Sequence, residues 1–366
     1  MKRLFFTITV LFTVISVPLL TSWTPVFAAD SRPNFSYKIC KNSGGETIFS
    51  VLTGLISPVN FIADQSVTPE PAEQTVQKKI EPKQTEQNKP TQKTVPVKQT
   101  EQDSFIVLEN IPYIKNGGIH QQLDLYLPKN YQTATQPFPL IIVIHGGGWI
   151  GGSKDSAKFV EWSRFLAENG YAVAAINYRL RPKFLLPTQI IDSKSAVRWL
   201  RANAKRYNLD AEHFGAIGSS AGGHLASSLG TSAHVKEFDQ GENLDQSGTV
   251  QAVVDFCGPS DFLTFRADEK SAKGLFGENA GNQDIIEKTS PLHTVTKNAA
   301  PFLIVHAIDD ERVPMEQGKR LHESLQKSGV ESDFIELSSG GHGSPLFKSP
   351  ETKKRILDFF GKHLKK

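Results

Sequence analysis

The chain has 366 residues, of which 39% are hydrophobic, and its 41 Lys and Arg residues nearly balance 38 Asp and Glu residues for a net charge of +3. This composition is typical of a globular protein and excludes a wholly disordered or collagen-like chain, and the charge provides no strongly basic field for a nucleic-acid partner. The two cysteines, Cys40 and Cys257, are too few for a multi-cysteine zinc site or a disulfide-stapled miniprotein.

Residues 1–28 have the pattern of an export signal. Lys2 and Arg3 precede an apolar run at residues 4–20, and the segment ends in Val-Phe-Ala at residues 26–28, with small residues at the −3 and −1 positions. We expect cleavage after this segment and a secreted or cell-envelope protein with no stable membrane insertion afterwards. An uncleaved anchor is the alternative, because the apolar run is nearly long enough to span a bilayer.

Residues 67–104 have the composition of a solvated linker. Gln, Thr, Lys, Glu and Pro make up 29 of these 38 residues, and the segment has no Gly and no aromatic residue. Such a segment cannot bury a core, so we expect it to be disordered. The short segment between signal and linker, residues 29–66, is too small to be expected to fold as a domain of its own, and the sequence leaves its structure open.

The remaining residues, 105–366, alternate predicted strands with predicted helices. Short apolar runs predict strands at 105–113, 122–127, 140–144, 172–177, 214–217, 250–256, 302–306 and 333–337. Helical patterns occur at 157–169, 190–207, 221–229, 315–328 and 352–363. The first two strands favour an antiparallel edge, and the later alternation predicts an α/β domain with a mostly parallel sheet covered by helices on both faces.

The strongest chemical signal is the G-x-S-x-G sequence at residues 218–222, which follows a predicted strand and opens a predicted helix. This context is typical of a nucleophile elbow, a strained turn whose small neighbours let the central serine project from the sheet. Ser220 is therefore the candidate nucleophile. A Gly/Ser loop without a catalytic role is the alternative, because G-x-S-x-G also occurs by chance.

A second glycine-rich segment, His-Gly-Gly-Gly-Trp at residues 145–149, directly follows the predicted strand 140–144. Glycines let backbone N–H groups approach the anion of a tetrahedral intermediate without a Cβ atom in the way. We expect the N–H groups of Gly147, Gly148 and Ala221 to form such an oxyanion hole.

The same glycines allow a rival interpretation. Gly146, Gly148 and Gly151 also satisfy the G-x-G-x-x-G pattern of a dinucleotide-binding loop. The next predicted strand, however, runs into Asn-Tyr-Arg at residues 177–179 and offers no acid for a ribose hydroxyl, which disfavours NAD. Arg179 leaves NADP formally open.

An activated serine needs a histidine base held by a carboxylate, and after a nucleophile elbow the chain order is Ser, Asp or Glu, His. His342 fits as the base, because it lies in a glycine-rich loop between the last predicted strand and the terminal helix. Asp309 and Asp310 both follow the predicted strand 302–306, and their spacing alone does not choose between them.

The other histidines near these elements have simpler interpretations. His306 lies within an apolar strand and His363 on a charged helix, so we expect core packing for the first and solvent exposure for the second. His224 opens the helix after the elbow, where we expect it to pack or to form a structural hydrogen bond.

Five motifs, in their order and spacing, resemble the α/β-hydrolase esterase and lipase group. They are HGGGW at 145–149, NYRL at 177–180, GSSAGGH at 218–224, D-x-x-V-P at 310–314 and GHG at 341–343. The likeness covers residues 105–366 and is closest to bacterial secreted carbohydrate esterases of the acetyl xylan or feruloyl type. One departure is Ala307, where that group usually has glycine.

The resemblance implies an α/β-hydrolase fold with Asp310 as the acid of the triad. It also implies a serine esterase that acts on short-chain esters, including acetyl or feruloyl esters of carbohydrates, and that needs neither metal nor organic cofactor. A peptidase or amidase with the same triad, or a non-catalytic binding protein, are the alternatives. The sequence leaves the oligomeric state open.

Cys257 follows the predicted strand 250–256, close to the expected site. We expect a small buried residue there rather than a second nucleophile, since cysteine packs well in cores. A disulfide between Cys40 and Cys257 would tie the N-terminal segment to the sheet, and we do not favour it.

Overall fold

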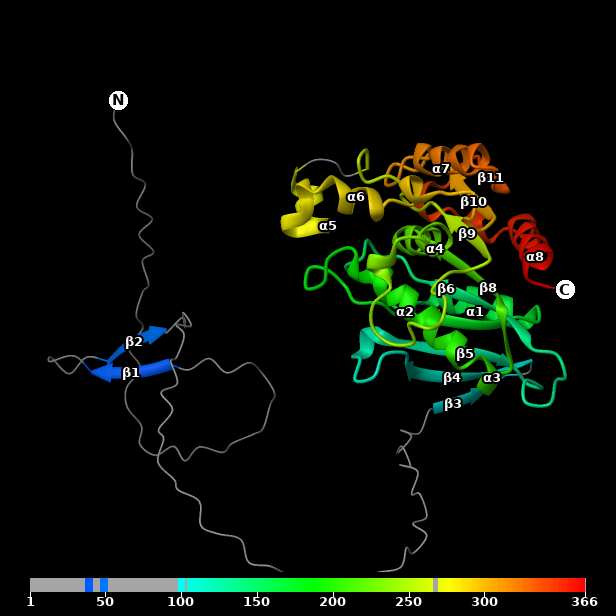
Figure 1. The fold of residues 1–366 in the computed structure, drawn as a ribbon, viewed down its shortest axis with the longest axis horizontal. Coiled ribbons are helices and arrows are strands. Elements are labelled where there is room, and N and C mark those ends of the chain that lie inside the picture. The colour runs from blue at the N-terminus through cyan, green and yellow to red at the C-terminus, as the bar shows by residue number, and fades with distance from the viewer. Residues whose placement is uncertain (1–36, 42–46, 52–97, 103, 266–268, 366) are drawn as a thin grey trace, which may run out of the picture. The chain divides into compact units, whose positions relative to one another are not determined.

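The structure, a computed structural model, describes residues 37–41, 47–51, 98–102, 104–265 and 269–365. The expected export signal and nearly all of the expected linker lie outside these residues. Contacts divide the chain into two units, residues 1–87 and 88–366. In the first unit, strands β1 (Tyr37–Lys41) and β2 (Thr47–Val51) form an antiparallel pair within the segment 29–66 (Figure 1).

The second unit contains a nine-stranded sheet with the order β11-β10-β9-β8-β6-β7-β5-β4-β3 (Figure 1). Its strands are β3 (Lys98–Glu101), β4 (Phe105–Pro112), β5 (Gln122–Pro128), β6 (Phe138–Ile144), β7 (Ala172–Ile176), β8 (Leu209–Ser219), β9 (Ala252–Phe256), β10 (Phe302–Ala307) and β11 (Ser332–Leu337). Strands β6 to β11 pair with one another in parallel, whereas β3, β4 and β5 form the antiparallel edge. The predicted α/β class and the predicted antiparallel edge are confirmed.

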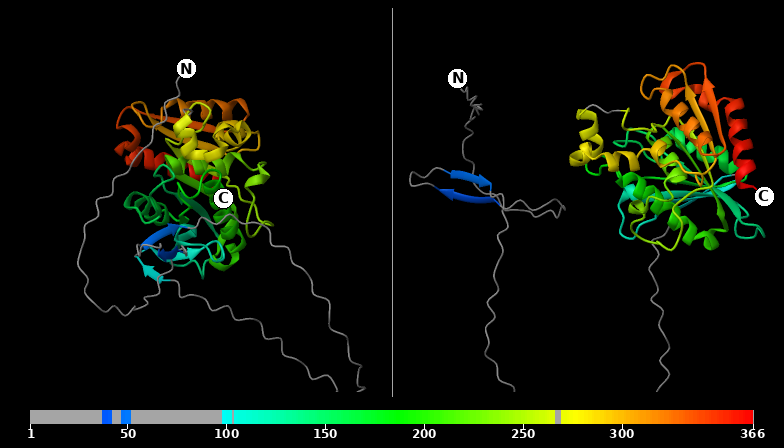
Figure 2. Two further views of the ribbon diagram at one scale, coloured as in Figure 1. Left: turned by 90° about the vertical axis from the view of Figure 1, so that its left-hand side faces the viewer. Right: turned by 45° about the horizontal axis from the view of Figure 1, so that its top comes forward.

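Helices cover both faces of this sheet (Figures 1 and 2). They are α1 (Ala157–Glu168), α2 (Thr188–Ala202), α3 (Ala204–Tyr207), α4 (Ala221–Thr231), α5 (Glu269–Phe276), α6 (Gln283–Lys288), α7 (Glu316–Lys327) and α8 (Pro350–Leu364). Side chains of α1 and α8, such as Trp162 and Phe360, form one buried apolar cluster, and those of α2, α4 and α7, such as Leu225 and Leu321, join a second. Because successive strand residues point to opposite faces, one sheet serves both clusters.

Strand β3 lies inside the segment 67–104 that composition predicts to be a linker. Its sequence, Lys-Gln-Thr-Glu, contains no apolar residue, but an edge strand is held by backbone pairing, here with β4. Thr100 Oγ1 also donates a hydrogen bond of 2.7 Å to the Glu109 carboxylate. The sheet therefore begins before residue 105, where the sequence predicts its start.

The predicted helix 190–207 is in fact two helices, α2 and α3, separated at Asn203. The Asn203 side-chain amide donates a 2.8 Å hydrogen bond to the Trp199 carbonyl, which competes with the backbone ladder at that turn. The short helices α5 and α6 were not predicted, because eight and six residues carry too little periodicity to be recognised.

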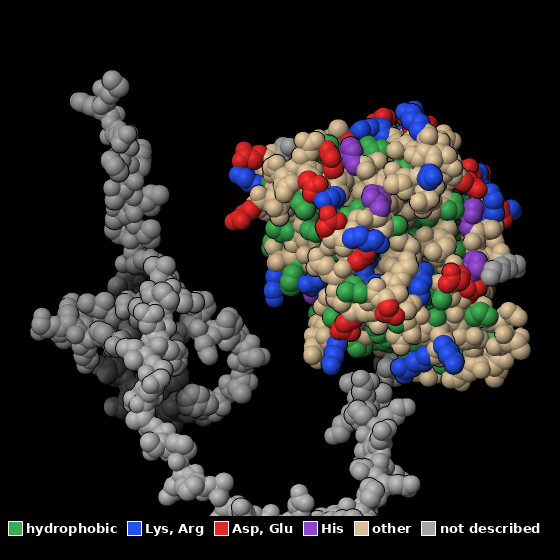
Figure 3. Space-filling model, in the orientation of Figure 1, with side chains coloured by type: hydrophobic (Ala, Val, Ile, Leu, Met, Phe, Trp, Pro, Cys, Tyr) green, Lys and Arg blue, Asp and Glu red, His purple; other side chains and the backbone are tan. Residues whose placement is uncertain are grey.

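Positive and negative side chains are interspersed over the face of the second unit seen in Figure 3, without a large patch of one sign. Of the helices that the structure describes, none combines the length and the apolar character needed to cross a bilayer.

Candidate active site

Ser220 occupies a strained turn between β8 and α4. Strand β8 ends at Ser219, α4 begins at Ala221, and the φ angle of Ser220 is +59°, a region that non-glycine residues seldom adopt. The turn also requires glycine on both sides: a Cβ on Gly218 would lie 2.1 Å from the Gly222 carbonyl oxygen, and a Cβ on Gly222 would lie 2.1 Å from the Ile144 carbonyl oxygen. This is the geometry expected of a nucleophile elbow.

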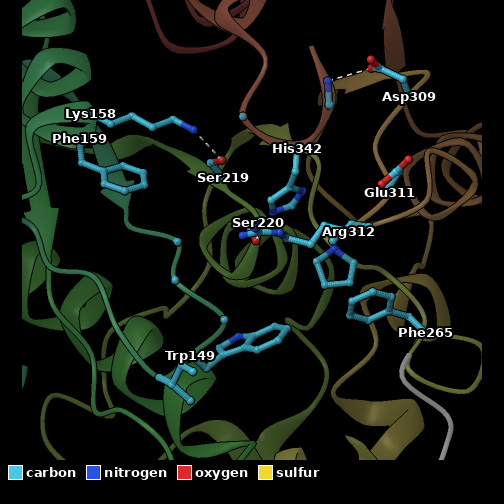
Figure 4. A pocket seen from close by; sticks show the side chains of 18 residues that line it. Trp149, Lys158, Phe159, Ser219, Ser220, Phe265, Asp309, Glu311, Arg312 and His342 are labelled. Carbon is cyan, nitrogen blue, oxygen red and sulfur yellow. Dashed lines mark hydrogen bonds between the residues drawn. The ribbon is translucent and has the colours of Figure 1, made fainter. Parts of the chain in front are cut away.

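The structure brings Ser220, His342 and Asp310 together in one hydrogen-bonded chain. His342 Nε2 lies 2.7 Å from Ser220 Oγ, and His342 Nδ1 lies 2.8 Å from Asp310 Oδ2. Asp310 follows β10, and His342 lies in the 3₁₀ turn Gly341–Gly343 after β11. Because β8, β10 and β11 run parallel, their carboxyl ends share one edge of the sheet, where the three residues meet. Figure 4 shows Ser220 and His342 side by side at this edge.

Asp310 is a buried carboxylate with hydrogen-bond partners on both oxygens. Its Oδ1 accepts from the N–H groups of Arg312 and Val313, both at 2.9 Å, and its Oδ2 lies 3.4 Å from His306 Nε2 as well as 2.8 Å from His342. Burial opposes the charge, but the hydrogen bonds from His306, Val313 and His342 outweigh it and hold the pKa of Asp310 well below its usual range. Asp310 is therefore ionised at neutral pH.

His342 is held in its neutral form. Burial lowers its pKa, Asp310 raises it, and the positive charges of Arg312 and Lys158 lower it again, so that the pKa of His342 lies below its ordinary value of 6.5. With Nδ1–H donating to the ionised Asp310, Nε2 carries the lone pair and accepts from the Ser220 hydroxyl. This arrangement lets His342 remove the serine proton.

The adjacent aspartates, between which spacing alone did not choose, have separate tasks. Asp309 accepts hydrogen bonds from the N–H groups of Gly340 at 3.0 Å and Gly341 at 2.8 Å, and these bonds lower the pKa of Asp309. Asp310 alone bonds to His342. Asp309 thus secures the loop that carries His342, and Asp310 orients the imidazole.

The N–H groups of Gly147, Gly148 and Ala221 have no hydrogen-bond acceptor among the described residues, and the two glycines line the pocket with Ser220. Gly147 has a φ angle of +123° and Gly148 of +62°, and a Cβ on Gly147 would lie 2.2 Å from the Gly151 carbonyl oxygen. Residue 147 must therefore be glycine in this loop beside the elbow.

The structure does not support the rival interpretation of a dinucleotide-binding loop, which depended on a free Arg179. Arg179 donates from Nε and Nη2 to the buried carboxylate of Asp192 at 2.7 to 3.1 Å. Its guanidinium is therefore engaged and does not offer a site for a 2′-phosphate.

His224 behaves as expected, His363 is less exposed than expected, and His306 has one contact that was not expected. His224 is buried, with Nε2 2.8 Å from the Thr289 carbonyl oxygen, and burial lowers its pKa to about 4. His363 lies on α8 and pairs with Glu331 at 3.2 Å, but only 14% of its side chain is exposed, because its ring packs on that of Phe359 with the ring centres 4.8 Å apart. His306 is a core residue as expected, but its Nε2 also lies 3.4 Å from Asp310 Oδ2. The sequence did not indicate this contact, because it depends on how the loop after β10 folds back toward the strand.

Cys257 is a fully buried, free thiol, as its position after β9 indicated. Burial raises its pKa to about 12, and its Sγ lies 3.7 Å from the His342 carbonyl oxygen. Cys257, Asp310 and His342 approach closely enough for a metal site, within 4.8 Å. Both carboxylate oxygens of Asp310 and both ring nitrogens of His342 are already engaged in hydrogen bonds, so a metal ion would have to displace these bonds.

The site opens into a pocket of about 940 Å³, which is within the usual size of small-molecule sites. Besides the residues above, Trp149, Phe265, Lys158 and Arg312 line it (Figure 4). The sequence did not indicate Trp149, Lys158 or Arg312 as side chains of the pocket wall, because such a wall is assembled from loops and helices distant in the chain.

Comparison with known proteins identifies the family of the chain. The BD-FAE family model matches residues 123–325, more than half of the chain. "Esterase LipC" of Mycobacterium tuberculosis is 33% identical over 241 residues, which are 63% of this chain and 59% of LipC. The chain therefore spans less than two thirds of the length of this curated relative.

Two solved structures share the fold. "Truncated form of carbohydrate esterase from gut microbiota" is 29% identical with a TM-score of 0.66, over 74% of this chain and all of that one. An acetyl ester-xyloside bifunctional hydrolase from Caldicellulosiruptor lactoaceticus is 25% identical with a TM-score of 0.58, over 69% and 95% of the two chains. The chain belongs to the BD-FAE family, has the α/β-hydrolase fold, and is related to proteins named esterases and carboxylic ester hydrolases.

Proposed function

We propose that this protein is an exported serine esterase that hydrolyses short-chain carboxylic esters through a Ser-His-Asp triad and an acyl-enzyme intermediate. The observation that carries the proposal is the continuous chain of hydrogen bonds from Ser220 through His342 to Asp310, at 2.7 and 2.8 Å. The names of its relatives point to the same chemistry.

In the first half-reaction, Ser220 Oγ attacks the ester carbonyl carbon while His342 Nε2 takes the hydroxyl proton. Negative charge moves to the carbonyl oxygen, where the free N–H groups of Gly147, Gly148 and Ala221 donate to it. Collapse of the intermediate breaks the bond to the alcohol, which leaves with the proton from His342.

In the second half-reaction, a water molecule replaces the alcohol. His342 takes a proton from this water as its oxygen attacks the acyl-enzyme carbonyl, and the proton then passes to Ser220 Oγ as the carboxylic acid leaves. Asp310, ionised throughout, stabilises the imidazolium that forms in each half. Besides the ester and this water molecule, the proposed steps use only Ser220, His342, Asp310 and the three backbone N–H groups.

For the substrate, acetyl or feruloyl esters of carbohydrates are the first candidates. Support comes from the solved neighbours, one named a carbohydrate esterase and another an acetyl ester-xyloside hydrolase. The pocket volume of about 940 Å³ admits a sugar ring together with a small acyl group.

The test is turnover of 4-nitrophenyl esters from acetate to decanoate, beside a peptide amide panel, by wild type and Ser220→Ala. We expect hydrolysis that is fastest for the short acyl chains and that is lost in Ser220→Ala. Faster cleavage of amides would favour a peptidase, and absence of turnover by the folded wild type would favour a binding protein. Export is tested separately, by sequencing the N-terminus of the mature protein, which we expect to begin after residue 28.

A further inference from the structure

Lys158 is a cation of the active-site pocket that has no neutralising carboxylate in the part of the chain that the structure describes. Among the described residues, no Asp or Glu oxygen forms an ion pair with Lys158 Nζ, which donates instead to Ser219 Oγ at 3.2 Å. The ammonium lies 5.6 Å from the centre of the Phe347 ring and 5.9 Å from that of Phe159. Figure 4 shows the side chain reaching from α1 toward Ser219, the residue before Ser220.

The position of Lys158 in its helix and its burial both oppose the charge. Lys158 is the second residue of α1, where the positive end of the helix dipole disfavours a cation. Burial lowers the pKa of Lys158, and the nearby charge of Lys348 lowers it further. A residue that works against local stability in this way is expected at a functional site rather than in a structural role.

A second cation faces the same site. The exposed side chain of Arg312 extends toward Ser220 and His342 in Figure 4, and no described carboxylate pairs with its guanidinium. Arg312 and Lys158 are both close enough to His342 for their positive charges to lower the pKa of its imidazole.

The acidic side chains that line the pocket, Asp309 and Glu311, do not neutralise the charge of Lys158. Both carboxylate oxygens of Asp309 accept backbone hydrogen bonds from the His342 loop. The exposed Glu311 lies on the side of the pocket away from Lys158 (Figure 4). The wall formed by Lys158, Phe159 and Ser219 therefore presents positive charge, while Trp149 and Phe265 provide an apolar wall elsewhere in the pocket.

We propose that Lys158 binds a carboxylate on the substrate, so that the preferred esters are anionic. This inference rests on the proposed esterase function and names the substrate class for the same pocket. A carboxylate in contact with Lys158 would replace the missing counter-ion and form a charge-assisted hydrogen bond. It can belong to the alcohol, as in an acetylated uronic acid, or to the acyl group, as in a monoester of a dicarboxylic acid.

The test compares esters in matched pairs that differ only in the carboxylate. One pair is the methyl glycosides of galacturonic acid and galactose, each acetylated at the same hydroxyl, and the other is 4-nitrophenyl hemisuccinate and 4-nitrophenyl butyrate. The measured quantity is the ratio of kcat/KM between the anionic and the neutral member, at low and at high salt. The variants are Lys158→Met, Lys158→Arg and Lys205→Met, which removes an exposed positive charge on α3, away from the pocket.

In at least one pair, we expect the wild-type ratio to exceed about ten at low salt and to fall as salt screens the charge. Lys158→Met should lower that ratio by about 10- to 100-fold, Lys158→Arg should restore most of it, and Lys205→Met should leave it unchanged. The pair that responds identifies whether the alcohol or the acyl group carries the carboxylate.

A ratio near one in both pairs, or a ratio that Lys158→Met leaves unchanged, would overturn the inference while the esterase function stands. If the folded wild type hydrolysed none of the four esters, the esterase function would be overturned, and this inference with it. A ratio below one in both pairs would also contradict it.

Discussion

Asp309 and Asp310 are neighbours in the chain, yet they contact different groups, so their substitutions should have different effects. Asp310→Asn keeps the shape of the side chain but removes the charge that orients His342 and stabilises its imidazolium. We expect kcat to fall by about 10⁴-fold on a short-chain ester, by analogy with the serine protease triad. Asp309→Asn can still accept one of the two bonds from the His342 loop, so its kcat should stay within about tenfold of wild type.

Both aspartate variants would be assayed at saturating substrate, with melting temperatures measured alongside. A larger loss of kcat for Asp309→Asn at an unchanged melting temperature would contradict the assignment of Asp310 as the triad acid.

His306 is a positioning residue, because it acts on the reaction only through Asp310. Its Nε2 lies 2.8 Å from the Val313 carbonyl oxygen and 3.4 Å from Asp310 Oδ2. His306→Met fills a similar volume without a donor, and we expect kcat to fall by about tenfold or more while KM changes less. His306→Gln restores a donor and should recover part of kcat. Equal losses in the two variants would mean that packing, not the hydrogen bond, is what His306 provides.

The pH dependence of kcat/KM follows from the protonation state of His342. The imidazole must be neutral to take the Ser220 proton, so activity should fall as the pH drops through its pKa. Because that pKa is lowered from 6.5, the acid limb should have its midpoint below about 6.5, and the enzyme should stay active in mildly acidic solution. The measurement is kcat/KM for a neutral ester against pH, with circular dichroism to verify folding. A midpoint above 6.5 would contradict this environment for His342.

At the scale of elements, the junction of β8 and α4 tolerates only glycine at residue 222. An added Cβ there would lie 2.1 Å from the Ile144 carbonyl oxygen of β6, and backbone atoms cannot move aside as a side chain can. We expect Gly222→Ala to reduce the free energy of unfolding by about 3 kcal/mol and to displace Ser220.

The matched control is Gly361→Ala in α8, where an added Cβ meets nothing within 4 Å. A helical glycine replaced by alanine in open space should stabilise the protein by about 0.5–1 kcal/mol. Thermal unfolding and ester turnover of the two variants would be compared. Similar melting temperatures would show that the close approach at Gly222 does not constrain the elbow.

At the scale of the whole molecule, the motifs and the nine-stranded sheet all belong to the unit that starts at residue 88. A shortened chain that begins at residue 98 keeps β3, and we expect it to retain the kcat of the full chain. A chain that begins at residue 105 loses β3 and its pairing with β4, including the contacts from Thr100 to Glu109 and from Glu101 to Lys129. It should unfold a few degrees lower and aggregate more readily, because β4 becomes an exposed edge. Loss of turnover in the folded chain that begins at residue 98 would show that the N-terminal residues contribute to the site.

The amino-acid sequence was sufficient to predict the eight strands from β4 to β11 and the main helices, with differences at their ends. These elements have local signals, since apolar periodicity and turn-forming residues act over a few positions. It also indicated Ser220 and His342 as the nucleophile and base, because the elbow glycines and the glycine-rich loop are short motifs with a steric reason. Strand β3 has no apolar periodicity, because its residues are all polar and it is held by backbone hydrogen bonds to β4, which do not depend on side-chain type.

Only the tertiary structure shows what each aspartate contacts, because that depends on how the loops after β10 and β11 fold against each other. The family resemblance selected Asp310, whereas spacing alone left both aspartates open. The contact of His306 with Asp310 and the position of Lys158 beside Ser219 likewise join residues from different elements. Local sequence patterns determine helices, strands and turns. The pKa of a side chain in a pocket depends instead on its burial, its hydrogen bonds and the charges around it, and these are brought together only in the folded chain.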